Sequence, residues 1–370
     1  MKILILSCSM GEGHNSAANA LMEEFVLEGH EAEVADTLSF ASDRARSIVS
    51  SLYNNTIKNV PALFGAVYKA GKLYESTGLN SPVYLANTVY AEKLAKYIEE
   101  NKFDAAIATH LFGMDVLCEI KKKFNKDFPC YAVLTDYARI PLFAEPKLLD
   151  GYFIPHKDII PQLTKKGIEE NKIFCTGIPV SPKFRERKTK SEARELLGIP
   201  KRKKVWLVMS GGIGGGNTSG LCQDLLDVSD KNTLIYVLVG KNTDKMHSLD
   251  KKFGSSNRLI TVPFTAKVNL YMNASDILLS KAGGLSSTEA AVANIPIIHI
   301  NAIPGCETEN QRFFEEHNMS KSAKNTKEAA FLASALSFDP SKRKRMTLWQ
   351  RKEINPYATR DIVSKVTKNV

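Results

Sequence analysis

The sequence lacks the features that mark several common protein classes. Its six cysteines form no Cys-x-x-Cys pair, which argues against a disulfide framework and against a zinc site. Its longest apolar runs have the length of a strand and fall short of the roughly 20 residues that cross a bilayer, so no transmembrane helix is expected. The apolar stretch at residues 2–6 is too short for a signal peptide. We therefore expect a globular protein of the cytoplasm.

The chain carries an excess of positive charge. It has 370 residues, enough for about two domains, and a formal net charge of +10. No recognition motif and no basic run interleaved with aromatic residues is present, so no nucleic-acid partner is expected. Basic residues gather at 182–204 and 342–352, where each charge near anionic lipid adds about 1 kcal/mol of attraction. An anionic membrane surface fits these runs, and so does a solvated linker and helix surface.

Short apolar strands alternate with helical stretches in both halves of the chain. Helices are expected at 16–28, 91–100 and 192–197. Such alternation predicts an α/β fold with two Rossmann-like parallel-sheet domains facing across a cleft, and ligands bind at the carboxyl ends of such strands. The expected strands are 3–8, 31–35, 105–109, 131–135 and 151–154, then 205–209, 234–239, 259–262, 276–280 and 297–300.

The same pattern gives the domain boundaries. We expect a first domain over 1–182, a linker rich in proline and charge over 183–204, a second domain over 205–350, and a C-terminal helix over 351–370 that packs back on the first domain. Residues 41–79 do not fit the alternation. Their apolar face with basic flanks suits a helix lying on a membrane surface, and it also suits a helix packed against a domain core.

The strongest ligand signal is the stretch 280–310, SKAGGLSSTEAAVANIPIIHINAIPGCETEN. Glycines after a buried strand permit a tight turn, and Ser286 or Ser287 can cap the helix that follows. Free N–H groups and the dipole at that helix start favour a pyrophosphate. Glu289, expected in the first turn, either binds ribose hydroxyls or closes a capping box with its own helix. The polar turn at 304–310 lies where a sugar next to the phosphates would be.

The first half of the chain offers a candidate base. A glycine-containing loop follows the first strand and ends at His14, whose ordinary pKa near neutrality suits removal of a proton from an attacking hydroxyl. A structural role at the helix start is the alternative. His110 and Asp136 end two further strands and are expected near the same edge. Either can orient a base or hold an acceptor, or His110 can lead into its helix and Asp136 can cap a turn.

The second half adds a glycine loop at 211–216 and an aromatic residue. The loop lets backbone approach a phosphate or a bound acceptor closely, although no GK[ST] follows and it is not a P-loop. Phe264, after the strand 259–262, can lie against a nucleotide base or belong to the core.

Two other functions use parts of these features. A nicotinamide-dependent oxidoreductase would use the glycine loop 11–16 and Asp36 at the end of the next strand, although the third glycine of that fingerprint is missing. A non-catalytic protein that binds a nucleotide sugar or lipid would keep 280–310 and would not need His14.

Together these motifs resemble the GT-B glycosyltransferases of the group that includes monogalactosyldiacylglycerol synthases, bacterial processive diacylglycerol glucosyltransferases and, more distantly, the MurG enzyme of peptidoglycan synthesis. The similarity spans nearly the whole chain. It is carried by GEGHNSAANAL, TH at 109–110, LTD at 134–136, GIPVSPKF at 177–184, MSGGIGGG, LVGKN, KAGGLSSTEA and PGCETEN.

The resemblance implies an inverting, metal-independent transfer of a hexose from a UDP-sugar to a lipid hydroxyl, with diacylglycerol as the first candidate. Transfer from UDP-GlcNAc to another acceptor is the alternative within the group. It implies no cofactor beyond the UDP-sugar co-substrate, and a peripheral position on the inner face of the cell membrane. The sequence has no Asp-x-Asp motif, so a helix amino terminus would stabilise the departing UDP.

The resemblance also assigns residues. His14 would be the general base, and His110 with Asp136 would lie on the acceptor side. The donor would be bound by Gly13, Gly212, Phe264, Val268, Gly284, Leu285, Ser286, Ser287, Thr288, Glu289, Glu307 and Asn310.

Three places qualify the resemblance. Cys306 stands where the family often has Gln, which leaves the donor sugar open. Residues 137–141 differ from the His and aromatic pair of many relatives, which leaves the acceptor open. Residues 41–79 look like the family's acceptor and membrane-docking region.

Overall fold

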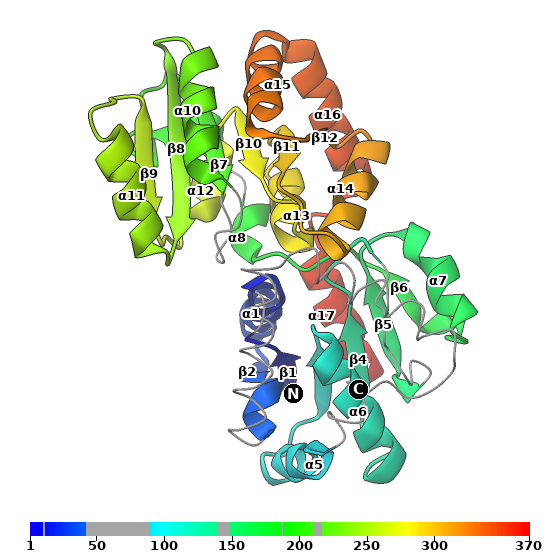
Figure 1. Cartoon of the computed structure of the whole chain (residues 1–370). Helices are drawn as coiled ribbons and strands as arrows, with labels where there is room; N and C mark the ends of the chain where they lie inside the picture. Colours follow the sequence, from blue (N-terminus) through cyan, green and yellow to red (C-terminus); the bar gives the residue numbers. More distant parts are fainter. Residues whose placement is uncertain (10–11, 42–88, 139–147, 187, 210–216) are drawn as a thin grey trace. The chain divides into compact units, whose positions relative to one another are not determined.

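The computed structural model describes residues 1–9, 12–41, 89–138, 148–186, 188–209 and 217–370. The segment 41–79 from residue 42 onward, Gly212 with its glycine loop, and residues 139–141 lie outside this part of the chain. The chain forms two compact units (Figure 1). Unit 1 comprises Met1–Pro182, Pro304–Cys306 and Pro356–Val370, and unit 2 comprises Lys183–Ile303 and Glu307–Asn355.

Unit 1 is built on a parallel sheet with the strand order β2-β1-β3-β4-β5-β6. The strands are β1 Lys2–Ser7, β2 Glu31–Asp36, β3 Ala105–Ala108, β4 Cys130–Val133, β5 Gly151–Ile154 and β6 Ile173–Cys175. The helices are α1 Glu12–Leu27, α5 Ala91–Glu100, α6 Leu111–Lys123, α7 Ile160–Lys165 and α17 Ala358–Asn369, with single 3₁₀ turns at Thr37–Phe40, Lys157–Ile159 and Glu170–Lys172.

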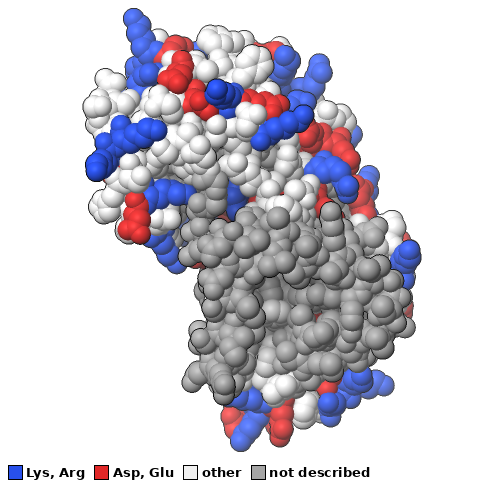
Figure 2. All heavy atoms as spheres, viewed as in Figure 1, with Lys and Arg blue, Asp and Glu red and all other residues white. Residues whose placement is uncertain are grey.

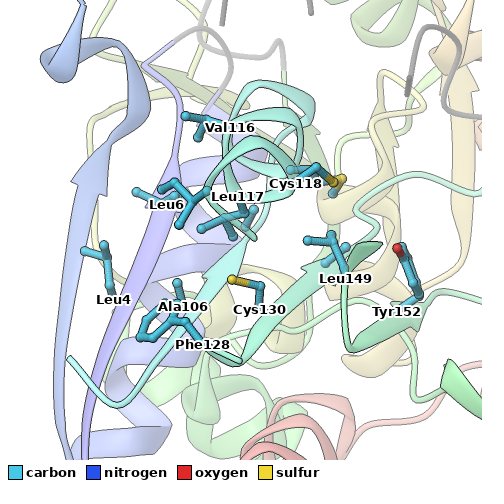
Figure 3. Close-up of a cluster of buried hydrophobic side chains, with 14 of the residues drawn as sticks. Leu4, Leu6, Ala106, Val116, Leu117, Cys118, Phe128, Cys130, Leu149 and Tyr152 are labelled. Carbon is cyan, nitrogen blue, oxygen red and sulfur yellow. The ribbon is translucent and has the colours of Figure 1, made fainter. Parts of the chain in front are cut away.

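Alternate residues of β1 enter two different cores. Leu4 and Leu6 pack with α5 and α6, and Figure 3 shows them in one cluster with Val116 and Leu117 of α6. Ile3 and Ile5 pack on the opposite face with α1 and α17. A strand covered by helices on both faces needs an apolar side chain at every position, which explains the continuous run ILIL. Gly113 lets α6 lie close to the sheet, since a Cβ there would come within 3.0 Å of the Leu6 Cβ.

Unit 2 has a parallel sheet with the order β12-β11-β10-β7-β8-β9. The strands are β7 Lys204–Met209, β8 Thr233–Gly240, β9 Leu259–Pro263, β10 Ile277–Ser280, β11 Ile297–Ile300 and β12 Ser320–Ala323. The helices are α8 Pro182–Arg185, α9 Lys190–Leu196, α10 Thr218–Val228, α11 Thr243–Phe253, α12 Val268–Ala274, α13 Gly284–Val292, α14 Cys306–Glu316, α15 Thr326–Phe338 and α16 Pro340–Glu353.

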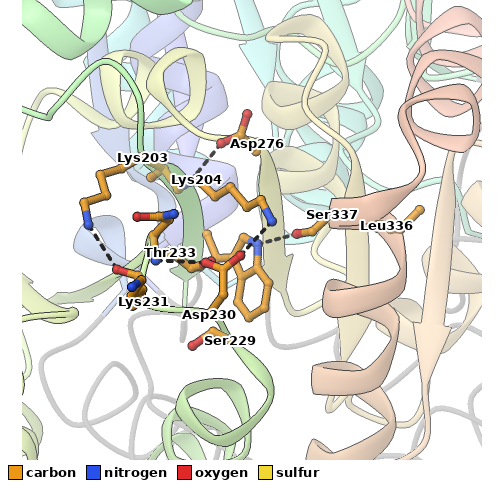
Figure 4. A network of polar contacts seen from close by, with 12 residues as sticks. Lys203, Lys204, Ser229, Asp230, Lys231, Thr233, Asp276, Leu336 and Ser337 are labelled. Atoms are coloured by element: carbon orange, nitrogen blue, oxygen red, sulfur yellow. Dashed lines mark hydrogen bonds and ion pairs between the residues drawn. The ribbon is translucent and has the colours of Figure 1, made fainter.

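Polar contacts hold the amino-terminal edge of this second sheet. The Asp276 carboxylate, just before β10, accepts a hydrogen bond from Val205 N–H at 2.8 Å (Figure 4). Lys204 pairs with Asp230 at 2.9 Å, and the indole N–H of Trp206 donates to Ser337 Oγ at 2.8 Å. These bonds fix the start of β7 to its neighbours on both sides.

The two-sheet α/β architecture is confirmed, and each expected strand is present within one or two residues of its expected ends. Two strands, β6 and β12, were not expected. Both lie at a sheet edge, and β12 has the polar sequence SKSA with only its first and last residues buried. The edge strand β12 lacks the apolar run that identifies a central strand, and β6 is apolar but only three residues long. In the described residues no helix combines the length and the apolar character needed to span a membrane.

The segment 183–204 contains folded structure. Helix α9 begins with a capping box between Thr189 and Glu192 and packs against α12. Ala193 and Ile199 are buried in a small core with Val205 and Ala274. Most of the segment expected to be a linker therefore contributes to unit 2.

Helix α17 closes unit 1 from the far end of the chain. Ile362, Val363 and Val366 are buried against β1 and α1. The buried Thr359 hydroxyl donates to the Val180 carbonyl at 2.6 Å and accepts from the Val180 N–H at 3.0 Å. One side chain thus satisfies both backbone groups of Val180.

We expect Thr359→Val to lower the free energy of unfolding of unit 1 by about 1–3 kcal/mol, because it leaves two buried backbone groups of Val180 without partners. Hydrogen-exchange protection of the β1 amides measures this loss. The matched control is Thr367→Val on the same helix, where the hydroxyl is half-buried and bonds only within α17. Equal protection in the two variants would contradict the role given to Thr359.

Candidate active site

In each sheet the strand order reverses between two neighbouring strands, β1 and β3 in unit 1, and β7 and β10 in unit 2. Loops leaving such a pair at the carboxyl ends run in opposite directions and open a crevice, the usual ligand site of a doubly wound sheet. The loop after β1 leads to His14, and β3 leads to His110. The loop after β10 leads to the start of α13. Most of the candidate residues therefore lie at these two reversals.

His14 is held in one orientation across the reversal in unit 1. It is half-buried in the first turn of α1, after Gly13, and its Nδ1 lies 2.9 Å from the Thr109 carbonyl oxygen. The Thr135 hydroxyl lies 2.8 Å from the same nitrogen. A carbonyl oxygen can only accept, so Nδ1 carries a proton, and in the neutral ring the lone pair is then on Nε2. The ring is thus in the tautomer that a general base requires at Nε2.

His110 lies beside His14. The two rings meet edge to face, with centroids 4.7 Å apart. The Phe112 N–H donates to His110 Nδ1 at 3.2 Å, so His110 caps helix α6. Burial, with a smaller contribution from His14, holds the pKa of His110 well below its ordinary value. A neutral His110 leaves His14 free to accept a proton without repulsion between two charged rings.

Two carboxylates complete the edge of unit 1. Asp136 is half-buried directly after Thr135, next to the His14 contact. Asp36, which a dinucleotide-binding protein would use for ribose, instead accepts the Leu38 N–H at 3.0 Å and caps a 3₁₀ turn. The cap gives Asp36 a structural role that does not depend on a dinucleotide.

In unit 2 the start of α13 differs from the expectation. Neither Ser286 nor Ser287 caps the helix, because α13 begins at Gly284 with Gly283 as its N-cap and no side-chain cap. Gly283 has a φ of −70°, which any residue can adopt. The first helical hydrogen bond runs from Ser287 N–H to the Gly283 carbonyl at 3.0 Å. The amides of Gly284, Leu285 and Ser286 precede that bond and have no acceptor within the helix, which is the arrangement that binds phosphate.

The hydroxyls of the next turn point into the protein. Ser287 Oγ lies 3.0 Å from His299 Nε2 on β11, and Thr288 Oγ1 donates to the Gly284 carbonyl at 2.7 Å. Ser287, Thr288 and His299 are all buried. Burial lowers the pKa of His299 to about 3, so its ring is neutral. The Ser287–His299 contact fixes α13 to β11, whereas the Thr288 hydroxyl bonds within its own helix, and ligand contacts at this helix start fall to backbone N–H groups.

Glu289 is the sixth residue of α13 and not part of its first turn. The capping-box alternative is excluded, since the N-cap is a glycine. The side chain is half-buried, and burial raises the pKa of its carboxyl to about 8. Desolvation disfavours the charged form of an acid, so the group is mostly protonated at neutral pH. A carboxylic acid can both donate to and accept from a hydroxyl.

A lysine that the sequence argument missed lies at the same place. Lys281 follows β10 directly and pairs with Glu307 at 3.1 Å. The other oxygen of Glu307 accepts the Ile303 N–H at 2.8 Å. Asn310 is fully buried, and its Nδ2 donates to the Ala282 carbonyl at 3.1 Å. Glu307 and Asn310 thus tie α14 to the loop before α13, and their contact with a sugar stays a prediction.

A second lysine adds positive charge nearby. Lys245 on α11 donates to Thr218 Oγ1 at the start of α10, at 3.2 Å. Burial lowers the pKa of Lys245, and the positive charge of Lys281 lowers it further. Lys281 follows β10 directly, so the rule that selected His110 and Asp136 could have found it, whereas Lys245 lies five residues after β8, inside α11. The same rule could have found Thr135 beside His14.

Phe264 and Val268 follow β9 at the same edge of the second sheet. Phe264 is 65% exposed, and Lys241 Nζ lies 5.5 Å from the centre of its ring. Val268 begins α12 and is half-buried. The core alternative for Phe264 is excluded by its exposure, and its ring face is available for stacking on a base.

The fold matches solved structures over the whole chain. MurG of Acinetobacter baumannii gives a TM-score of 0.63 at 12% identity, covering 100% of this chain and 99% of that chain. A UDP-GlcNAc 2-epimerase from Neisseria meningitidis, bound to UDP-GlcNAc, gives 0.64 at 16% identity and covers 100% of both chains. At these identities the likeness concerns the fold, which is GT-B.

Sequence comparison identifies the family. A model described as monogalactosyldiacylglycerol (MGDG) synthase matches residues 14–180, and one described as glycosyltransferase family 28 C-terminal domain matches residues 219–347. A processive diacylglycerol beta-glucosyltransferase of Bacillus pumilus is 30% identical over 85% of this chain and 81% of its own length. The enzyme of the same name from Staphylococcus saprophyticus is 27% identical over 97% and 90%. The chain therefore belongs to the monogalactosyldiacylglycerol synthase and processive diacylglycerol glucosyltransferase group of GT-B glycosyltransferases.

Proposed function

We propose that this protein transfers a hexose from a UDP-sugar to the free hydroxyl of diacylglycerol, with inversion at the anomeric carbon. Family membership supports the reaction class, and the names of the relatives support the acceptor. The observation that carries the proposal is the orientation of His14. Its Nδ1 is bound to the Thr109 carbonyl, and its Nε2 is left as a proton acceptor.

The reaction needs one proton to move. The acceptor oxygen attacks the anomeric carbon and forms a new C–O bond while the bond to the UDP oxygen breaks. His14 Nε2 takes the acceptor proton, and the resulting imidazolium keeps its Nδ1–H bond to the Thr109 carbonyl. The neutral His110 ring, next to His14, does not repel the positive charge that forms on His14. The electron pair leaves with UDP as a diphosphate oxyanion.

The donor is bound by unit 2. The free amides at Gly284, Leu285 and Ser286 and the dipole of α13 bind the diphosphate, and Lys281 and Lys245 supply two cationic charges close to it. Glu289 accepts and donates hydrogen bonds with the ribose, and exposed Phe264 stacks on the uracil. Charge on the leaving UDP is thereby stabilised by groups of the protein.

The acceptor requires access to lipid. Diacylglycerol resides in a membrane, and the protein associates with an anionic membrane surface through its basic residues, in keeping with its net charge of +10. The sugar, glucose or galactose or N-acetylglucosamine, depends on contacts around Glu307 and Cys306.

Purified protein is offered a panel of UDP-sugars with and without vesicles that contain diacylglycerol. We expect UDP release only when one UDP-hexose and diacylglycerol are both present, with a glycolipid as product. Binding of UDP without turnover on any lipid would favour a regulatory protein. Release of UDP with a water-soluble acceptor and not with diacylglycerol would show that the acceptor is not a lipid.

His14→Ala is expected to lower kcat by about 10²–10⁴-fold, the usual contribution of a general base, while the Kd for UDP changes little. The control is His30→Ala, which removes a histidine of unit 1 at the amino-terminal edge of the sheet, just before β2. Steady-state kinetics and UDP titration measure the two effects. Unchanged turnover in His14→Ala would remove this residue from the mechanism.

Glu289→Gln is expected to change the pH dependence of stability. In the wild type the folded pKa of about 8 exceeds the ordinary value near 4.5, so stability is greatest below pH 4.5 and falls as pH rises to 8. The variant should become more stable relative to the wild type over that window, by roughly 2–4 kcal/mol above pH 8.

Denaturant unfolding of both proteins between pH 4.5 and 9 measures this difference. Glu315→Gln, at an exposed position on α14, is the control and should show no such trend. A difference between Glu289→Gln and wild type that stays constant with pH would show that Glu289 is charged in the folded protein.

A further inference from the structure

The two basic runs of the sequence meet at one pocket in unit 2. The pocket has a volume of about 400 Å³ and is lined by Lys188 and Lys190 before and in α9, by Arg343, Lys344 and Arg351 on α16, and by Asp276. The cations come from segments about 150 residues apart in the chain, and buried Met272, Ile295 and Pro296 form part of its wall. On the face seen in Figure 2, by contrast, Lys and Arg alternate with Asp and Glu over unit 2.

The position of the pocket separates it from the donor site. Asp276 directly precedes β10 and Pro296 directly precedes β11, so the pocket lies at the amino-terminal edge of the sheet. The donor residues lie at the carboxyl-terminal edge. Ala293 and Asn294 end α13 at the pocket, whereas Gly284 begins it at the donor site. Nine residues of helix place these two ends about 13 Å apart.

The positive charge in the pocket is only partly compensated. Asp276 is the sole acid among its described lining residues, and it already binds Lys190 at 2.5 Å, Arg194 at 2.9 Å and Val205 N–H. The carboxyl ends of α12 and α13, and that of α15 to which Arg343 bonds, add about half a negative charge each. About two and a half positive charges remain after Asp276 and these helix ends are counted.

The cations differ in how firmly they are positioned. Arg343 donates to the Leu336 and Ser337 carbonyls, and Arg351 makes one long contact of 3.4 Å to Asn294 Oδ1. Because these acceptors carry no net charge, they do not neutralise the positive charge of either guanidinium group. Lys344 is exposed, and Arg343, Lys344, Thr347 and Arg351 share one face of α16. Guanidinium and ammonium groups that converge on a small recess suit a phosphoryl group, which accepts several charge-assisted hydrogen bonds.

We propose that this pocket binds a phosphoryl anion, either the phosphate of an anionic lipid headgroup or a soluble phosphate. This site is separate from the proposed transfer reaction. Only its occupation by a lipid headgroup rests on the proposed membrane association; binding of a soluble phosphate does not. A lipid phosphate in the pocket would bring the amino-terminal edge of the second sheet to the membrane surface.

The test compares two pairs of substitutions on one helix. Lys344→Gln with Arg351→Gln removes two charges from the pocket, and Arg345→Gln with Lys352→Gln removes two exposed charges from another face of α16. One arm measures binding to phosphatidylcholine vesicles with and without phosphatidylglycerol. The other arm follows amide chemical shifts during titration with inorganic phosphate.

We expect the pocket pair to weaken binding about tenfold or more in at least one arm, because two cations are lost from the recess, and the control pair to stay within about threefold of wild type. Loss on phosphatidylglycerol vesicles identifies a lipid headgroup, and loss with phosphate alone identifies a soluble anion. Equal loss in both pairs, or wild-type binding by the pocket pair, overturns the proposal. Transfer measured in detergent micelles should be unchanged in both pairs, so failure of the pocket is distinguishable from failure of the enzyme.

Discussion

Parallel pairing within each sheet, with one reversal of winding, determines where chemistry can occur in this protein. All strands of a sheet end at the same edge, and the reversals fall between β1 and β3 and between β7 and β10. At the first reversal His14, after β1, bonds to the Thr109 carbonyl at the end of β3. At the second reversal Lys281 and the amino terminus of α13 both follow β10. The local details of both half-sites, including ring tautomer and free amides, depend on this geometry.

Central strands were predictable because burial on both faces requires an apolar residue at every position, as in β1 and β10. The same rule could not find β12, whose SKSA sequence pairs only with β11. Strand ends were equally predictable as the location of polar groups, and this placed His14, His110 and Asp136 correctly at one edge of unit 1. The resemblance to a family then gave these positions roles that periodicity alone could not give.

What the sequence could not give were contacts between side chains distant in the chain. A serine at a helix start is ordinarily a cap, but Ser287 is the fourth residue of α13, its hydroxyl contacts His299 12 residues away in the chain, and the N-cap is Gly283. Lys281 and Glu307 pair across 26 residues, and His14 contacts Thr135 across 121. The ionisation of Glu289 likewise follows from packing around α13, since the sequence specifies the acid and not its desolvation.

Helix α13 joins two regions with opposite electrostatic requirements. Its amino terminus presents free amides and is flanked by Lys281, so it favours an anion, whereas its carboxyl terminus ordinarily calls for only a cation or two. Here α16 packs along α13 and carries Arg343, Lys344 and Arg351 to that second end, while α9 on α12 brings Lys190. Each of the two basic segments, 182–204 and 342–352, is by itself compatible with a solvated surface. The cations of both runs converge at one recess, where Asp276, the one acid among the described lining residues, is already bound by two cations. This convergence is a property of the fold, and it makes both ends of α13 favourable for anions.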